Sequence, residues 1–292
     1  MAFRRILVPL TGTAAGEAAL ATALMTARIW NSHIHCLHVR VDARDVAPLA
    51  GEGLSGAMIE EMMAATERES GERAGRVRAL FERFVAHAGP ITLADSAETA
   101  NKADGVTISF ESIPGREEDV VAQQARLYDL AVVPHPEADS DVSSSDALHA
   151  VLFDSGRPVL IAPLTPPATI GNRVCCAWNG TAESASAIDV SLPWLHHAQA
   201  RQVLYSEDYQ RRGPKVEGIL AYLHWHGVDA EGKQFKPISK DVGAGLLAAA
   251  RDFEADLICM GAYSHSRLRQ LILGGVTRHV LENADIPVLM RR

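Results

Sequence analysis

Short apolar runs alternate with longer amphipathic stretches along the second half of the chain. The apolar runs are rich in β-branched residues and lack polar alternation, which is typical of strands covered by helices on both faces. Such strands pair in parallel through right-handed crossovers. The expected strands cover residues 174–178, 201–206, 233–239, 256–260 and 287–290, and the expected helices cover residues 183–198, 214–227, 243–255 and 269–284. The pattern predicts an α/β fold with open, doubly wound sheets.

The first half of the chain repeats this pattern in the same order. The matching segments are 4–20 with 172–188, 128–134 with 255–261, and 157–163 with 286–292. A duplication of about 140 residues indicates two domains and not a solenoid of short repeats. We therefore expect one domain at residues 1–167 and a second at residues 168–292.

The first half also carries an extra helical segment at residues 58–89. Its apolar positions follow helical spacing and predict a helix packed on one side; they are Val77, Leu80, Phe81, Phe84 and Val85. A second apolar face consists of Met58, Ile59, Met62 and Met63. This face would pack in the core or, alternatively, cap a binding cleft or meet a partner.

Composition narrows the classes of function. The net charge of the 292 residues is -8, and an acidic surface does not favour DNA or RNA, whose binding would need clustered Lys and Arg. No apolar run is long enough to span a membrane, so we expect a cytoplasmic protein. The cysteines fall mostly in strand-like runs, which predicts buried, reduced thiols; they are Cys36, Cys175, Cys176 and Cys259.

The sequence contains no motif for catalysis or metal binding. Its 12 histidines include the pair His33 and His35, but none has the carboxylate or cysteine spacing of a zinc site. A phosphate-binding P-loop, a serine nucleophile elbow and a Rossmann glycine motif are also missing. We therefore expect neither catalytic residues nor a metal site.

Candidates for binding chemistry lie in two turns that follow strands of the second half. In an open parallel sheet ligands bind at the carboxyl ends of strands, so the turns at 179–181 and 261–264 should be neighbours there. Glycines permit close backbone approach, and N–H groups at a helix start suit a phosphate. Ser264, His265 and Thr277 would add hydrogen bonds. Alternatively, the glycines form only tight turns, which are common in α/β domains.

The second turn carries a resemblance to a known family. Gly261, a two-residue gap, Ser264, nine residues, then Gly274 and Gly275 resemble the signature G-x2-G-x9-G-[S/T] of ATP-binding universal stress proteins. The resemblance covers essentially the whole chain twice. This chain departs from the signature at Ser264, where the family has glycine, and at Gly275, where it has Ser or Thr. Asn179 stands where the family places an acidic residue.

The resemblance implies two tandem five-stranded sheets of the universal stress protein type, similar to adenine nucleotide alpha hydrolases and related by a pseudo-two-fold axis. It also implies that the second domain holds ATP or AMP, with or without Mg²⁺, as a regulatory ligand and not as a substrate. Ribose would lie near Asn179 and adenine against the backbone of residues 201–206. The implied contact residues are Ala177, Asn179, Met260, Gly261, Ser264, His265, Gly274, Gly275, Val276 and Thr277.

The first half lacks these features. Pro134 stands in place of Gly261, and Thr11 in place of Asn179. Proline removes an N–H group that a phosphate would need. We therefore expect a nucleotide only in the second half.

The family commonly dimerises through its last strands, which implies pairing of residues 159–163 with 288–292 inside one chain. Further homodimerisation is left open. Two alternatives to nucleotide sensing remain: a stress-response interaction scaffold that binds no nucleotide, and a weak ATP hydrolase.

Overall fold

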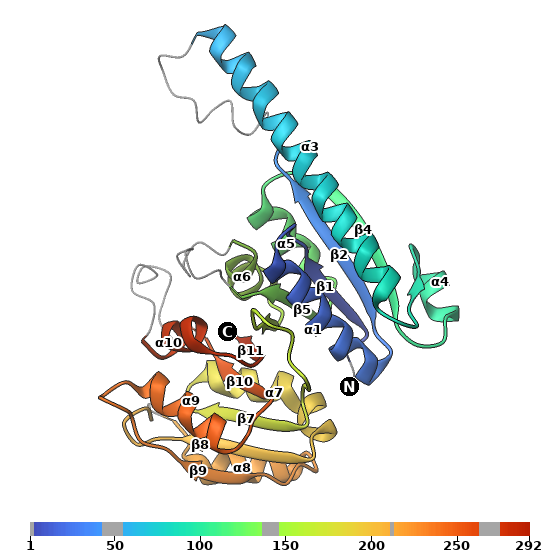
Figure 1. Ribbon diagram of the computed structural model, residues 1–292. Coiled ribbons are helices and arrows are strands. Elements are labelled where there is room, and N and C mark those ends of the chain that lie inside the picture. Colours follow the sequence, from blue (N-terminus) through green and yellow to red (C-terminus); the bar gives the residue numbers. More distant parts are fainter. Residues whose placement is uncertain (1–2, 43–54, 136–145, 211–212, 263–274) are drawn as a thin grey trace.

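The computed structural model describes residues 3–42, 55–135, 146–210, 213–262 and 275–292 (Figure 1). The strands are β1 (Arg5–Pro9), β2 (His33–Arg40), β3 (Thr92–Leu93), β4 (Thr107–Pro114), β5 (Leu130–Pro134), β6 (Val159–Ala162), β7 (Arg173–Trp178), β8 (Ala200–Tyr205), β9 (Glu231–Gln234), β10 (Leu257–Gly261) and β11 (Val288–Arg291). The helices are α1 (Ala14–Trp30), α3 (Gly56–His87), α4 (Ala97–Lys102), α5 (Glu117–Ala125), α6 (Asp146–His149), the π-helical η3 (Ala150–Ser155), α7 (Ala182–His197), α8 (Val216–Trp225), α9 (Val242–Asp252) and α10 (Gly275–Asn283).

The described strands form one sheet, in the order β3-β4-β2-β1-β5-β6-β11-β10-β7-β8-β9. Leaving out the short edge strand β3, each half has the same doubly wound order, with its first strand at the centre. The predicted α/β class is therefore confirmed. The two expected sheets are joined into a continuous one, because β6 and β11 pair with each other.

The two halves meet at an antiparallel pair with a symmetric register. Leu160 of β6 pairs with Leu289 of β11, its counterpart in the sequence repeat, and the flanking pairs are equally matched. All other strand pairs in the sheet are parallel. The register places a local pseudo-two-fold axis at this leucine pair, and the predicted pairing of the last strands is confirmed.

Local hydrogen bonds repeat between the halves. Thr13 caps the amino end of α1, and Thr181 caps α7 in the same way, each side chain accepting an N–H bond at 3.3 Å. Asp129 accepts N–H bonds of 2.8 and 3.0 Å at the start of β1. Asp256 accepts bonds of 3.1 and 2.8 Å at the start of β7. The duplication thus preserves how strands and helices begin.

Helices cover both faces of the sheet, and each face has an apolar core that crosses the junction (Figure 1). One core lies beneath α1, α3, α7 and α8. The other lies beneath α5, α6, η3, α9 and α10. All four cysteines are buried and free, as expected. Among the described helices, none is long and apolar enough to span a membrane.

Helix α3 confirms the predicted extra helix but not the packing of its methionine face. Its buried residues are Val77, Leu80 and Phe81, all in its carboxyl-terminal half. The amino-terminal half projects beyond the sheet (Figure 1), where Met58 is 53% exposed. Interpreting this face as core is therefore wrong for Met58, because no sheet lies beneath that part of the helix.

The strand expected at 233–239 is shorter and shifted. Strand β9 ends at Gln234, and Pro237, which has no N–H group to donate to a neighbouring strand, follows soon after. A tight turn closes next, with N–H···O bonds of 3.0 and 2.8 Å exchanged between Ile238 and Asp241. The helix expected at 269–284 is α10 over its described part, and residues 269–274 lie outside the described residues.

Candidate functional site

The two turns selected from the sequence begin side by side, at Asn179 and Gly261. Cys176 of β7 pairs with Cys259 of β10, so these parallel strands end together at one edge of the sheet. Helices α7 and α10, which follow these strands, cover opposite faces of the sheet. Asn179 and Gly261 therefore flank the point at which the strand order changes direction, where open α/β sheets bind ligands.

Gly261 makes a close backbone contact. A Cβ atom at this position would lie 2.6 Å from both the carbonyl carbon of Glu183 and the nitrogen of Ser184. The absence of a side chain thus lets β10 end against the first turn of α7. Packing alone requires this glycine, in agreement with the alternative of a tight turn.

The side chain of Asn179 is oriented by its own turn. Its Oδ1 accepts bonds from the N–H and the Oγ1 hydroxyl of Thr181, at 3.2 and 2.9 Å. The residue is 6% exposed. No described residue accepts a bond from Nδ2, so this amide group can donate to a hydroxyl oxygen.

The other predicted contacts differ in accessibility. Ala177 and Met260 have side chains in the core, at 2% and 0% exposure, so only their backbones can contact a ligand. Gly275, Val276 and Thr277 form the first turn of α10, where backbone N–H groups lack helical partners. Ser264, His265 and Gly274 lie outside the described residues.

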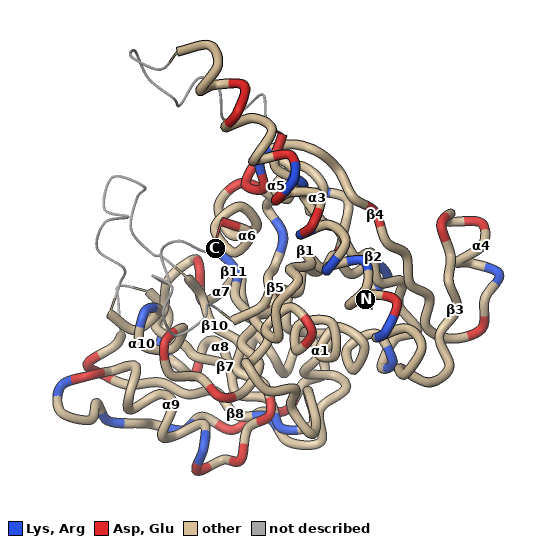
Figure 2. Tube along the Cα trace, turned by 45° about the horizontal axis from the view of Figure 1, so that its top comes forward, with Lys and Arg blue, Asp and Glu red and all other residues tan. Residues whose placement is uncertain are grey.

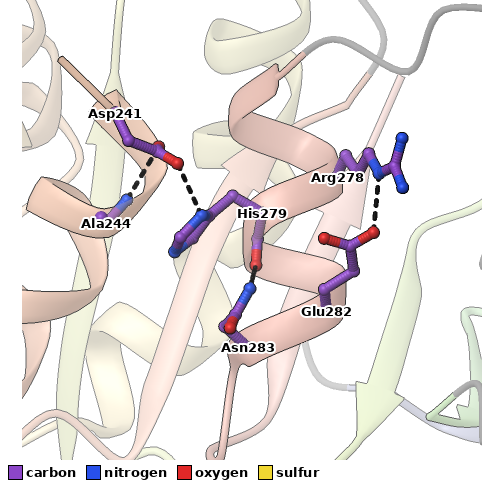
Figure 3. Close-up of polar contacts among 6 residues, drawn as sticks. All are labelled: Asp241, Ala244, Arg278, His279, Glu282 and Asn283. Atoms are coloured by element: carbon purple, nitrogen blue, oxygen red, sulfur yellow. Dashed lines mark hydrogen bonds and ion pairs between the residues drawn. The ribbon is translucent and has the colours of Figure 1, made fainter. Parts of the chain in front are cut away.

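An Asp–His pair that the sequence did not reveal links α9 to α10 (Figure 3). His279 Nδ1 lies 2.8 Å from Asp241 Oδ2, and Asp241 Oδ1 caps α9 by accepting the Ala244 N–H at 3.1 Å. This N–H bond is the largest cause lowering the pKa of Asp241; desolvation opposes the shift and His279 adds to it. His279 also packs on Gly243. A Cβ atom built on Gly243 would lie 2.6 Å from the Cβ atom of His279. The pair therefore positions the first turn of α10.

Replacing Asp241 with alanine should lower the free energy of unfolding by about 1 kcal/mol, because α9 loses its cap and α10 loses a contact. Asp229→Ala is the matched control, since Asp229 pairs with His224 where both side chains are at least 80% exposed. The control should stay within about 0.5 kcal/mol of the parent protein. Urea unfolding measures both, and equal losses would contradict a special role for Asp241.

A pocket of about 520 Å³ lies beyond the carboxyl ends of β8 and β9. Its volume suits a small-molecule ligand. Ser239 and Lys240 adopt left-handed φ values of 51° and 68°, a costly conformation for residues other than glycine. This turn places Lys240 at the pocket. The lining residues are Ser206, Glu207, Asp208, Gln234, Phe235, Lys236, Pro237, Lys240 and Val242.

The corresponding edge of the first half is arranged differently. The Thr11 hydroxyl lies 3.0 Å from that of Thr13. A Cβ atom on Gly12 would lie 3.4 Å from Val77 Cγ2, because α3 packs on this turn. Pro134 ends β5. Among the described residues, α3 therefore covers the turn of the first half that corresponds to the turn at Asn179.

Comparison with known proteins agrees with this duplicated architecture. The model of the universal stress protein family matches residues 2–155 and again residues 173–292. A universal stress protein from Synechocystis, Slr1230, is 43% identical over 47 residues, which covers 16% of each chain.

Similar folds occur among solved structures. A universal stress protein from Archaeoglobus fulgidus is similar with a TM-score of 0.63 and 14% identity, covering 99% of this chain and 98% of the other. A putative universal stress protein from Pseudomonas aeruginosa has a TM-score of 0.51 and 17% identity, covering 99% and 93%. At these identities the likeness concerns the fold. Because the family model matches both halves, the chain belongs to the universal stress protein family as a tandem member.

Proposed function

We propose that the second half of the chain, residues 168–292, binds ATP or AMP as a regulatory ligand in a cytoplasmic stress response. The observation that carries the proposal is the grouping of Asn179, the Gly261 turn and the first turn of α10 at the change in strand order. The nucleotide acts as a signal and not as a substrate.

Each part of a nucleotide has a suitable neighbour along this edge. The N–H groups of Gly275 to Thr277 suit phosphate oxygens, and the dipole of α10 favours their negative charge. The Nδ2 group of Asn179 suits a ribose hydroxyl. The adenine would lie against the end of β8, beside Ser206 and the adjoining pocket. Any Mg²⁺ would arrive bound to the phosphates.

A gain of affinity tests the ribose contact. Asn179→Asp keeps an oxygen for Thr181 and offers the ribose a charged acceptor, so ATP binding should strengthen about tenfold. Thr11→Asp, the equivalent change in the first half, should leave binding unchanged. Isothermal titration with ATP measures both variants; unchanged affinity in Asn179→Asp would contradict the placement of the ribose.

Nucleotide carried through purification tests the function itself. Heat denaturation of the fresh protein should release ATP or AMP, identifiable by mass spectrometry. If no nucleotide is released and none binds on titration, the interaction-scaffold alternative gains support. The exposed Met58 on the projecting half of α3 favours that alternative, because this segment is placed to contact a partner.

A further inference from the structure

The antiparallel junction brings arginines from both halves together. Strand β11 ends beside the start of β6, so Arg291 and Arg292 of the second half lie beside Arg157 of the first. Arg291 also pairs with Gly261 across the parallel β10–β11 ladder, and its carbonyl accepts the N–H of Ala262 at 3.0 Å. Arg157, Arg291 and Arg292, here called the arginine cluster, therefore adjoin the turn assigned above to the nucleotide. The chain end lies beside α6 in both views (Figures 1 and 2).

Neutral groups orient the guanidinium groups of this cluster. Arg157 donates from Nε and Nη2 to the Arg126 carbonyl, at 3.2 and 2.8 Å. Arg126 donates to the Asp154 carbonyl at 3.3 and 3.2 Å. The guanidinium carbon of Arg292 lies 4.9 Å from the centre of the Phe153 ring. These contacts use some of the five donors of each arginine, and none of them is to a carboxylate.

Acidic side chains do not neutralise the cluster. Among the described residues, no Asp or Glu side chain lies within ion-pair distance of Arg126, Arg157, Arg291 or Arg292. Desolvation and the nearby charge of Arg157 lower the pKa of Arg291, against a weaker opposite effect of Asp189. Like charges held together cost free energy, which a bound anion would recover.

The opposite end of the junction provides an internal comparison. There, the repeat places Ala162 and Pro163 where the second half has Arg291 and Arg292. Arg251 lies near this end of the junction, and its Nη2 atom is 3.7 Å from the carboxylate of Asp285. The pseudo-two-fold symmetry therefore does not require an arginine cluster without acidic partners, and within the described part of the junction such a cluster lies at the end beside the proposed site.

We propose that Arg157, Arg291 and Arg292 bind the terminal phosphates of the nucleotide held by the second half. This inference rests on the proposed function and extends it, because it makes a triphosphate the preferred ligand and makes the first half part of the site. Arg291 pairs with Gly261 on the neighbouring strand, about 4.8 Å away, so the backbone positions of Arg291 and Arg292 lie close to the phosphate end of a ligand at Gly261. Bonds from guanidinium to phosphate are charge-assisted and often bidentate.

The test compares ATP, AMP and inorganic pyrophosphate by isothermal titration. In the parent protein ATP should bind at least about tenfold more tightly than AMP, since hydrogen bonds between charged groups are stronger than those between neutral groups. The double variant R157Q/R292Q should lose about tenfold in ATP affinity and keep its AMP affinity within twofold. R292Q alone should show part of the loss, and it removes no backbone hydrogen bond. R251Q is the matched control and should change neither affinity.

Each outcome decides a separate question. If the parent protein binds ATP and AMP equally, or if R157Q/R292Q and R292Q keep the preference for ATP, the arginine site is overturned. Equal losses for ATP and AMP overturn it too, since they indicate a general structural effect. If neither nucleotide binds, the proposed function fails. In that case, if the parent protein binds pyrophosphate and R292Q does not, the arginines form a site for free phosphate compounds. If the parent protein does not bind pyrophosphate either, the arginine site is overturned.

Discussion

Gly261→Ala should destabilise the protein by about 3 kcal/mol, the upper end of the usual cost of inserting an atom into well-packed structure. The new Cβ atom would lie 2.6 Å from backbone atoms of Glu183 and Ser184, and neither can rotate away as a side chain could. Either β10 or the start of α7 must shift. Because both elements flank the proposed site, ATP affinity should fall together with stability. Urea unfolding and isothermal titration measure the two effects.

Gly275→Ala is the matched control. Among the described residues outside its own helix, none lies within 4 Å of a Cβ atom built on Gly275, and alanine suits a helix better than glycine. Its free energy of unfolding should therefore stay within about 0.5 kcal/mol of the parent value, or rise. Equal destabilisation by the two substitutions would refute the close contact at Gly261.

The protein should lose stability as the pH falls from 6.5 towards 4, because of two histidines on β2. Desolvation lowers the pKa of His33 from 6.5 to about 4, helped by His35 and Arg5. Desolvation also lowers the pKa of His35 from 6.5 to about 4, helped by Arg5. In this window the unfolded chain binds protons that the folded chain does not, so acid favours unfolding. The expected loss at pH 5 is on the order of 1 kcal/mol for each histidine, because solvent screening of these partly exposed side chains reduces the effect of the pKa shift.

Denaturation in urea at pH 7.5 and at pH 5.0 measures this loss. His33 bonds to Thr107 and Ser109 at 2.9 and 3.0 Å, and glutamine can replace part of these contacts. H33Q/H35Q should therefore show a smaller difference in stability between the two pH values than the parent protein. H224Q changes an exposed histidine and should keep the full difference. A double variant as acid-sensitive as the parent would assign the effect to other groups.

The repeat in the sequence was sufficient to predict the fold class and the duplication, whereas the pairing across the junction was predicted from the resemblance to the family. Apolar periodicity reports which faces of a segment are buried. The matched segments at 157–163 and 286–292 carry the same strand in each half. Equivalent edge strands can pair with each other around a two-fold axis, which removes two exposed edges. Leu160 and Leu289 pair in this way.

Periodicity did not reveal contacts between segments that lie far apart in the chain. His279 meets Asp241 because α9 and α10 pack side by side, and the histidine at 279 has no local pattern that predicts its partner. The methionine face of α3 has helical spacing like any core face. Only the position of α3 beyond the sheet leaves Met58 exposed. Pro237 was the local signal for the early end of β9, and the prediction of a strand at 233–239 overlooked it.

By itself, the sequence determined that two similar α/β units share this chain and that the glycine-rich turn belongs to the second. Local patterns suffice for this, because strand and helix formation depend on burial repeated over a few residues. The tertiary structure decided that Gly261 is required for packing, that α3 covers the turn of the first half, and that arginines of both halves meet beside the second. These features depend on distances between distant segments, which arise only when the whole sheet has formed.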